Sequence, residues 1–481
     1  MAAELEIDFL ASSTRALADP QLRANFRRAM DGLMAKRAAA FPDPAEWARL
    51  RALGTAIRAK NLRRLPELLV QLEQNLVRNG IVVHWAGTAA QGNQIVLELL
   101  QARGVKALVK GKSMVSEEMG LNAWLQGHGI EVVEADLGEY IIQLADETPS
   151  HLILPAIHKN KDQIARLFSA RIREAQYTEQ VDELTAMARA VLRQKFLAAQ
   201  AGVSGVNFAV AETGTLCLVE NEGNGRMSTH VPPLHIALMG LEKVVEKLDE
   251  VAPLYSLLTR SATGQPITTY FNLISGPRGA GELDGPLEVH LVLLDNGRSR
   301  IHRDPELRTT LACIRCGACM NHCPVYTRIG GHAYQAVVPG PIGSVLTPQM
   351  EGAGLRHDLP HASSLCGACA EVCPVGIPLP SLLVRMRREG SHLGPADAAG
   401  PVLGAGGARS RLEGLLWSAW GWVLSHPAQY RAAAWLATRF GRWVPPAAPV
   451  LRAWARSRTL PRPAGRSLQE RIRARGEVPH V

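Results

Sequence analysis

The sequence lacks any run of about 18 apolar residues, the length that a helix needs to span a bilayer. Its start, MAAELEIDFLASS, is acidic and lacks the basic residues and apolar centre of a signal peptide. Cysteine is scarce outside one short segment. Of the eight cysteines in the chain, seven lie within residues 313–373 and only Cys217 lies elsewhere. A disulfide framework spread over a secreted fold would not concentrate its cysteines in this way. We therefore expect a cytoplasmic protein, in a reducing compartment, whose cysteines bind metal.

Several common catalytic and cofactor signatures are missing as well. The chain contains no GxGxxG, GxxxxGK[ST], GxSxG or HExxH motif. We therefore assign no catalytic residue and expect neither a flavin nor a nicotinamide cofactor.

The size and charge of the chain limit its class. At 481 residues and 47% apolar composition, it is long enough for two to four domains with a large core. The net charge of +9 resides in residues 391–481, which hold 13 arginines, no lysine and four acidic groups. No aromatic stacking module or basic recognition fold accompanies this charge, so no nucleic-acid partner is expected.

Apolar spacing divides the chain into four predicted regions. Residues 1–70 show the three-and-four spacing of helices and predict a helical N-terminal arm. From Ile81, a strand-like run, a helix to Leu100 and a second strand-like run predict a βαβ unit. Apolar runs continue to alternate with helical stretches, so residues 71–300 are expected to form a parallel α/β domain. The further strand-like runs are GIEVVEAD, SHLILPAIH, AVAETGTLCLVENEG, PLHIALMGLEKVV and LEVHLVLLD.

The last two regions differ from the first two in composition. Residues 301–390 carry the cysteines on either side of a Gly- and Pro-rich segment, VVPGPIGSVLTPQMEGAG, and predict a mainly helical domain. Residues 391–481 begin with a predicted linker, PADAAGPVLGAGGARS, and continue as helical sequence. These helices could pack on the cysteine domain, dock a partner subunit, or lie on an acidic membrane surface. They contain six tryptophans: Trp417, Trp420, Trp422, Trp435, Trp443 and Trp454.

Cysteine spacing is the most specific signal in the chain. The first motif, CxxCxxCxxxCP, runs from Cys313 to Pro324 and is the bacterial ferredoxin run. The second, CxxCxxxCP, runs from Cys366 to Pro374. Paired CxxC motifs also build structural zinc sites. Here, however, three regularly spaced cysteines followed by a proline occur in both motifs, and this pattern favours iron-sulfur clusters. Two clusters on one small domain indicate a relay of single electrons.

The ferredoxin run also predicts which cysteines share a cluster. Three cysteines separated by two residues each can bind three irons of one cubane cluster, whereas the fourth cysteine of the run binds the other cluster. The predicted ligands are Cys313, Cys316, Cys319 and Cys373 for cluster 1, and Cys323, Cys366 and Cys369 for cluster 2.

Cluster 2 then lacks one protein thiolate. Extending the second motif back by three residues reaches Ser363, where a complete run would have cysteine. Ser363 is a candidate fourth ligand, and water, substrate or a three-iron cluster are the alternatives. We expect two 4Fe-4S clusters, with a 3Fe-4S form or a non-cysteine ligand as alternatives for the second.

The remaining candidate residues give weaker signals. Ligands of open α/β sheets bind beyond the strand ends. Chance is the better explanation of each polar loop there taken singly, but together the loops could bind a small carboxylate or phosphate. Cys217 is expected to pack in the core, and the histidines in apolar runs, His84, His235 and His290, receive no role. The residues that could converge on an anion are Lys112, Ser113, His158 and Arg226, and Gly223 and Gly225 could let backbone amides approach it.

Seven phrases make the chain similar to the lactate-utilisation protein B family of bacterial iron-sulfur proteins over nearly its full length. They are KGKSMVSEE, EADLGEYIIQLADETPSHLILPAIHK, LVENEGNGRM, HIALMGLEKVV, SATGQPITTY, CIRCGACMNHCPVY and SLCGACAEVCPVGIP. The resemblance implies an α/β domain like those of sugar isomerases and CoA-transferases, followed by a ferredoxin-type domain. It assigns the seven clustered cysteines to the clusters. The second motif of the family also has three cysteines, and the tail SLQERIRARGEVPHV matches it least well.

The resemblance further implies a role in oxidising L-lactate to pyruvate, within a complex of A-, B- and C-type subunits. We expect a non-catalytic electron carrier that passes electrons singly toward a soluble or membrane acceptor, with peripheral binding to the inner face of the membrane as an alternative location. The alternative function is an α/β enzyme acting on a small acid or CoA ester, with the clusters as a Lewis-acid site or redox sensor.

Overall fold

The computed structural model describes residues 8–353, 355–391, 411–443 and 464–475. The chain divides into two compact units, Met1–Ala408 and Arg409–Val481. The predicted linker (residues 395–410) and Trp454 lie outside the described residues, as does most of the acidic start. Within the described part, no helix is long and apolar enough to cross a membrane.

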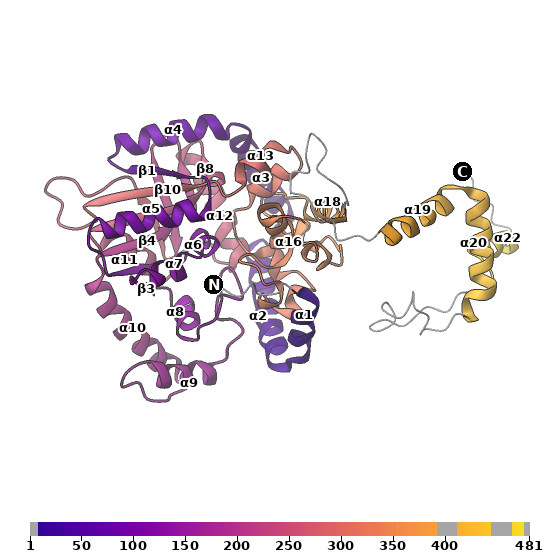
Figure 1. The fold of residues 1–481 in the computed structure, drawn as a ribbon, viewed down its shortest axis with the longest axis horizontal. Coiled ribbons are helices and arrows are strands. Elements are labelled where there is room, and N and C mark those ends of the chain that lie inside the picture. Colours follow the sequence, from indigo (N-terminus) through magenta and orange to yellow (C-terminus); the bar gives the residue numbers. More distant parts are fainter. Residues whose placement is uncertain (1–7, 354, 392–410, 444–463, 476–481) are drawn as a thin grey trace. The chain divides into compact units, whose positions relative to one another are not determined.

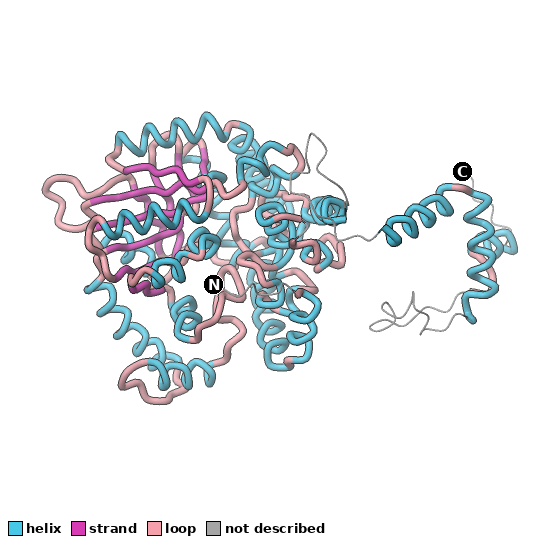
Figure 2. Tube along the Cα trace, in the orientation of Figure 1, coloured by secondary structure: helices cyan, strands magenta, loops and turns pink. Residues whose placement is uncertain are grey.

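The first unit contains a six-stranded sheet in which all pairs of neighbouring strands are parallel (Figures 1 and 2). Its central strands are apolar runs buried on both faces, as is typical of a parallel sheet covered by helices. In spatial order the strands are β1 (Val82–Ala86), β10 (Glu288–Leu294), β7 (Leu234–Gly240), β4 (Ala201–Gly205), β2 (Ala107–Lys110) and β3 (Glu131–Glu134).

Helices cover this sheet on both faces. Alternate residues of β7 divide between two cores, with Ile236 on one face and Ala237 on the other. Three helices, α5, α6 and α7, share the core that contains Ile236, and α5 lies in front of the strands in Figure 1. The helices around the sheet are α5 (Ala89–Gln101), α6 (Met114–Met119), α7 (Leu121–Gly127), α8 (Leu137–Leu144), α9 (Lys161–Arg171), α10 (Val181–Ala198), α11 (Asn224–His230) and α12 (Val251–Ala262).

A second, four-stranded sheet packs into the core on the other face. Its order is β8 (Val244–Val245), β5 (Phe208–Val210), β6 (Thr215–Glu220) and β9 (Tyr270–Ile274). The run AVAETGTLCLVENEG therefore forms an antiparallel hairpin in this sheet and adds no strand to the parallel one.

Four helices precede the sheet. Asp19 and Asp43 cap the second and third with their side chains, and a proline follows each aspartate in the first turn. Apolar residues of these helices share one core with the second sheet and six buried cysteines. The helices are α1 (Phe9–Ala18), α2 (Pro20–Ala40), α3 (Pro44–Arg63) and α4 (Leu65–Arg78).

The cysteine region consists of short helices joined by turns. The Gly- and Pro-rich segment between the two motifs contains a helix, α16, which is buried from Gly340 to Gln349. The elements are α13 (Arg298–Arg303), η3 (Leu307–Ala312), α14 (Ala318–Asn321), α15 (Tyr326–Ile329), η4 (His332–Tyr334), α16 (Gly340–Glu351), η5 (Leu359–His361), α17 (Ala368–Glu371) and α18 (Leu379–Ser391).

The segment SHLILPAIH differs from its prediction, because residues 150–158 form bends and turns instead of a strand. The Ser150 carbonyl accepts a hydrogen bond of 2.6 Å from the Tyr326 hydroxyl. His151 pairs with Asn321 at 2.9 Å. Ser150 and His151 therefore bond to the cysteine region, Leu152 is buried, and the amides of Ser150 and Ile157 bond to carbonyls within the segment instead of to a neighbouring strand.

The second unit is helical. The described side chains of α19 and α20 include no buried residue. Trp417 and Trp420 are each 57% exposed, and Trp422 and Trp435 are about half exposed. The elements are α19 (Arg411–Ser425), α20 (Pro427–Phe440), η6 (Gly441–Trp443) and α22 (Leu468–Arg475).

Candidate metal centre

Seven cysteines of the cysteine region fall into two groups. The first group, defined here by four thiols around one cavity, draws three members from the first motif and one from the second. Leu152, from the segment predicted as a strand, also lines this cavity. The members of the first group are Cys313, Cys316, Cys319 and Cys373.

The second group contains the other three cysteines, Cys323, Cys366 and Cys369. Burial raises the pKa of Cys369 to about 11, and the thiols of Cys323 and Cys366 contribute to that rise. Burial also raises the pKa of Cys323, and Cys366 adds to the effect. Cys366 is exposed, whereas the other two are buried. This group therefore lies closer to solvent at one corner.

Backbone amides surround the sulfur atoms. The amide of Arg315 donates to Cys313 Sγ at 3.4 Å, and that of Tyr326 donates to Cys323 Sγ at 3.5 Å. The amide of Ile377 donates to Cys373 Sγ at 3.4 Å. Such bonds favour thiolates over thiols and adjust the potential of a cluster.

The two motifs also share a backbone conformation. Arg315 and Leu365, each directly before a cysteine, have left-handed φ values of 62° and 56°. Gly317 and Gly367, each directly after that cysteine, have φ values of 74° and 88° and precede the short helices α14 and α17. The same loop is therefore built twice.

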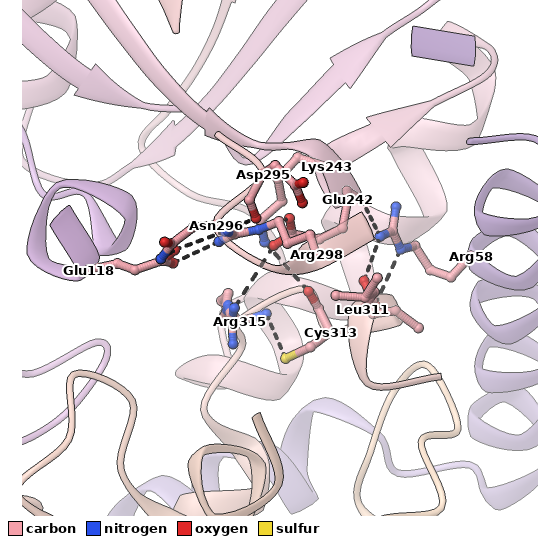
Figure 3. A network of polar contacts seen from close by, with 11 residues as sticks. Arg58, Glu118, Glu242, Lys243, Asp295, Asn296, Arg298, Leu311, Cys313 and Arg315 are labelled. Atoms are coloured by element: carbon pink, nitrogen blue, oxygen red, sulfur yellow. Dashed lines mark hydrogen bonds and ion pairs between the residues drawn. The ribbon is translucent and has the colours of Figure 1, made fainter. Parts of the chain in front are cut away.

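A buried network of charges, drawn in Figure 3, joins the α/β region to the first group. Arg298 forms ion pairs with Glu118 at 2.7 Å and with Glu242 at 2.6 Å. Glu242 lies 3.9 Å from Arg315, next to the cysteine loop. Although burial alone would raise the pKa of Glu242, its cationic neighbours, Arg298 foremost, lower it to about 2. Glu242 is therefore ionised.

Two further cations of the network touch the backbone that leads to Cys313 (Figure 3). Arg58 of α3 is 1% exposed and donates to the carbonyls of Leu311 and Ala312 at 3.0 and 3.2 Å. Lys243 Nζ lies 3.5 Å from the carbonyl oxygen of Cys313. The network thus contains three carboxylates, those of Glu118, Glu242 and Asp295, and four cations, the fourth being Arg315, so it carries excess positive charge beside the first group.

The N-terminal helices supply more cations to the second motif. Arg51 donates to the carbonyls of Cys373 and Ala370, both at 2.9 Å. Arg37 donates to the carbonyl of Val372 at 3.3 Å. These arginines fix the turn that carries Cys373.

The residues present fit an anionic iron-sulfur group. Arg315 Nη1 and Arg37 Nε are buried without a hydrogen-bond partner among the described residues. Both belong to arginines next to the first group, so an anion there would complete their surroundings. Soft thiolates are the ligands that such clusters require. In the described part of the chain, no three His, Cys, Asp or Glu side chains are arranged to hold a single metal ion.

Three family models match the chain. A LUD domain matches residues 69–294, a 4Fe-4S dicluster domain matches residues 309–377, and the C-terminal model of lactate utilisation protein B matches residues 385–477. The second match supports iron-sulfur clusters over structural zinc as the bound group.

Similar proteins extend over nearly the whole chain. The lactate utilization protein B of Shouchella clausii is 41% identical over 468 residues, which are 96% of this chain and 95% of that protein. The chain belongs to the lactate utilisation protein B family. The Bacillus subtilis member is 46% identical over 76% of this chain and 77% of its own. An uncharacterized electron transport protein of Escherichia coli is 39% identical, over 96% of this chain and 95% of its own.

One solved structure was also matched, a DUF162 family protein from Deinococcus radiodurans. It covers 48% of this chain and 98% of its own at 16% identity, with a TM-score of 0.28. That score is too low to compare the two folds.

Most residues of the weaker predicted anion site contact the protein's own groups, whereas Lys112 Nζ is buried without a hydrogen-bond partner among the described residues. The amides of Gly225 and Arg226 donate to the Glu220 carboxylate at 2.6 and 2.7 Å, so an internal anion already fills that turn. Lys112 lies 3.4 Å from Glu139. His158 bonds to Ser150 and Glu147, both at 2.7 Å.

The other candidates have structural surroundings. Ser113 caps α6 by accepting from Ser116. Cys217 is 1% exposed within the large core. His84 and His290 bond to each other at 3.0 Å, and His235 bonds to Ser204 at 2.8 Å.

Sequence reasoning missed the charges around the first group. Arg58, Glu242, Lys243 and Arg298 are distant from the cysteines in sequence and lack a motif. The one available signal is the pair Glu242–Lys243 inside the apolar run HIALMGLEKVV, because adjacent charges are seldom buried without a partner.

Proposed function

We propose that this chain is the electron-carrying subunit of a lactate utilisation system that oxidises L-lactate to pyruvate. The observation that carries the proposal is the pair of cysteine groups, each drawing thiols from both motifs, in a member of the lactate utilisation protein B family. Two clusters in one region would allow electrons to be accepted and passed on singly.

The first group is proposed to hold cluster 1, with Cys313, Cys316, Cys319 and Cys373 as ligands. The second is proposed to hold cluster 2, through Cys323, Cys366 and Cys369. The cavity between the first four thiols supports this division, as do the contributions of Cys366 to the raised pKa of Cys323 and of Cys323 and Cys366 to the raised pKa of Cys369. When bound, the clusters supply one-electron chemistry, whereas the chain's amides and arginines position the thiolates and offset their charge.

The functional division of the chain is proposed to follow the predicted regions 1–70, 71–300, 301–390 and 391–481. The matches of the LUD, 4Fe-4S dicluster and C-terminal models support the last three. Partners are proposed to be A- and C-type lactate utilisation subunits, with the C–H bond of lactate broken in one of them. The acceptor is proposed to lie at or near the membrane.

A second candidate is an enzymatic role for the α/β domain on a small acid or CoA ester, in keeping with a sugar isomerase or CoA-transferase type of fold. It is favoured by buried charges at the carboxyl ends of β2 and β3, next to the region where parallel sheets bind ligands. Lys110 Nζ contacts Glu134 at 2.7 Å and Glu117 at 3.0 Å. Burial raises the pKa of the nearby Glu139 to about 7, in the range of a general acid or base.

Anaerobic electron paramagnetic resonance tests the leading proposal. Reconstituted protein would be measured before and after addition of L-lactate and the partner subunits. Two cluster signals appearing with lactate would support the relay, whereas loaded clusters that lactate never reduces would support the enzymatic role.

Iron content tests the ligand sets. The variant Cys316→Ala should lose cluster 1, whereas the matched variant Cys217→Ala, which removes a buried thiol outside both groups, should keep full iron content. Full iron content in Cys316→Ala would contradict the assignment.

A further inference from the structure

The doubled loop places Ser363 where the first motif has Cys313. In the first motif, the side chain of Cys313 accepts a hydrogen bond from the amide two residues later, Arg315, at 3.4 Å. In the second, the Ser363 hydroxyl accepts from the amide two residues later, Leu365, at 3.1 Å. Both donors have left-handed φ values, so the two loops present a sulfur and an oxygen in the same local setting.

The backbone carbonyls of these two residues also have matching partners. Lys243 Nζ lies 3.5 Å from the carbonyl oxygen of Cys313, and Arg387 Nη2 donates to that of Ser363 at 2.9 Å. Arg387, on α18, also donates to the carbonyl of Pro360 at 2.9 Å. A cation therefore fixes the start of each loop, although the two cations come from different parts of the chain.

We propose that the hydroxyl oxygen of Ser363 is the fourth protein ligand of cluster 2. Cys313 lines the first cavity together with Cys316 and Cys319 of its own motif. The repeated loop assigns the equivalent place beside Cys366 and Cys369 to Ser363 Oγ. The inference rests on the proposed function, because it takes Cys323, Cys366 and Cys369 as ligands of that cluster.

The chemistry is a ligand exchange without a change of oxidation state. The Ser363 oxygen binds the fourth iron in place of a water molecule, and the hydroxyl proton leaves with that water. An alkoxide is a harder ligand than a thiolate, and it donates from a residue that is only partly buried. The second cluster is thereby expected to have spectroscopic properties distinct from those of the first.

The test uses Ser363→Ala and Ser363→Cys in the full-length chain, with Ser364→Ala as the matched control. Ser364 carries the adjacent hydroxyl group and is exposed. The pKa of the Cys366 thiol is lowered by hydrogen bonds from the Ala368 amide, which has the larger effect, and from the Ser364 hydroxyl. Each variant is reconstituted anaerobically with iron and sulfide. Iron content and Mössbauer and electron paramagnetic resonance spectra are then recorded without lactate.

Ser363→Ala is expected to lose one iron per chain and to show the signal of an oxidised three-iron cluster. Ser363→Cys is expected to keep the iron of the unaltered protein, with changed spectra of the second cluster only. Ser364→Ala removes a hydrogen bond to the Cys366 thiol but no proposed ligand, so it is expected to keep the iron content of the unaltered protein and to show no three-iron signal. Spectra and iron content of Ser363→Ala identical to those of the unaltered protein would overturn the inference, as would a three-iron signal in Ser364→Ala alone.

A further variant separates this inference from the proposed function. Cys369→Ala should remove all signals of cluster 2. If it does so while Ser363→Ala changes nothing, Ser363 is not a ligand but the cysteine assignment stands. If Cys369→Ala also leaves cluster 2 unaltered, both the cysteine assignment and the inference are wrong.

Discussion

Lys243 places an ammonium group beside the backbone of a proposed ligand, in a network with more cations than carboxylates. A cluster held by four thiolates gains negative charge when it is reduced. Nearby buried cations therefore stabilise its reduced form and raise its potential. This argument concerns the first group, because the cations of Figure 3 surround Cys313.

Replacing this lysine should lower the potential of cluster 1. A unit charge about 8 Å away at an effective dielectric constant of about 20 contributes about 2 kcal/mol, or roughly 90 mV for one electron. We expect a shift of that order in Lys243→Met, measured by redox titration with electron paramagnetic resonance. The control Lys247→Met removes an exposed lysine four residues later and should leave the potential unchanged. An unchanged potential in Lys243→Met would mean that this charge does not act on the cluster.

Arg58 has a structural role at the same site. Its guanidinium donates to four backbone carbonyls, those of Glu242, Val244, Leu311 and Ala312. Arg58→Met would leave these buried acceptors without a donor and is expected to lower the free energy of unfolding by about 3–5 kcal/mol. Arg63→Met, at an exposed position of the same helix, is the control for denaturant titrations. A loss below about 1 kcal/mol would show that water replaces the guanidinium.

At the scale of single elements, β7 carries a buried histidine through the centre of the parallel sheet. His235 is fully buried, and this burial lowers its pKa to about 3. Its unfolded pKa is about 6.5. The unfolded chain therefore binds a proton that the folded protein excludes, and stability is lost as the pH falls below about 6.5.

This histidine should contribute about 2 kcal/mol to the loss of stability between pH 7 and pH 5. His235→Gln keeps a polar group near Ser204 but cannot bind the proton. The free energy of unfolding of this variant should therefore fall by about 2 kcal/mol less between pH 7 and pH 5 than that of the unaltered protein. Urea titrations at several pH values measure the difference. The exposed His128→Gln should retain the full dependence. Parallel pH profiles for His235→Gln and the unaltered protein would contradict the buried-proton argument.

Elements also differ in how far the sequence predicts them. The cysteine loops are local: spacing, trailing proline and glycine lie within a few residues, so the two groups could be predicted. The order of the parallel sheet is not local, because three strands lie between β1 and β2, which are joined by a single helix in sequence. The strand prediction for residues 150–158 is wrong, because Ser150 and His151 bond to Tyr326 and Asn321 of the cysteine region, which lies far away in sequence.

At the scale of the whole molecule, the cysteines, the charged network and the main core all lie within residues 1–408. The helices α19 and α20 of the other unit expose tryptophans. Apolar side chains exposed in such numbers are typical of an interaction surface.

Removing residues 409–481 is therefore expected to leave iron content and thermal stability unchanged and to abolish association with the partner subunits. Co-purification and gel filtration with A- and C-type subunits measure the association. The full-length double variant Trp417→Ala and Trp420→Ala tests the exposed tryptophans without truncation, and should weaken binding at least tenfold. Unimpaired association of the truncated chain would place the docking surface within residues 1–408.

The place of Cys373 among the thiols of the first motif has a consequence for biosynthesis. Translation produces Cys313, Cys316 and Cys319 well before Cys373, so the first group stays incomplete while the segment between the motifs is made. The arginines that fix the turn around Cys373 come from α2 and α3, which are synthesised much earlier, near the N-terminus. The proposed cluster 1 can therefore be completed only after Cys373 has been made, and the contacts of that turn with α2 and α3 can form only from that point on.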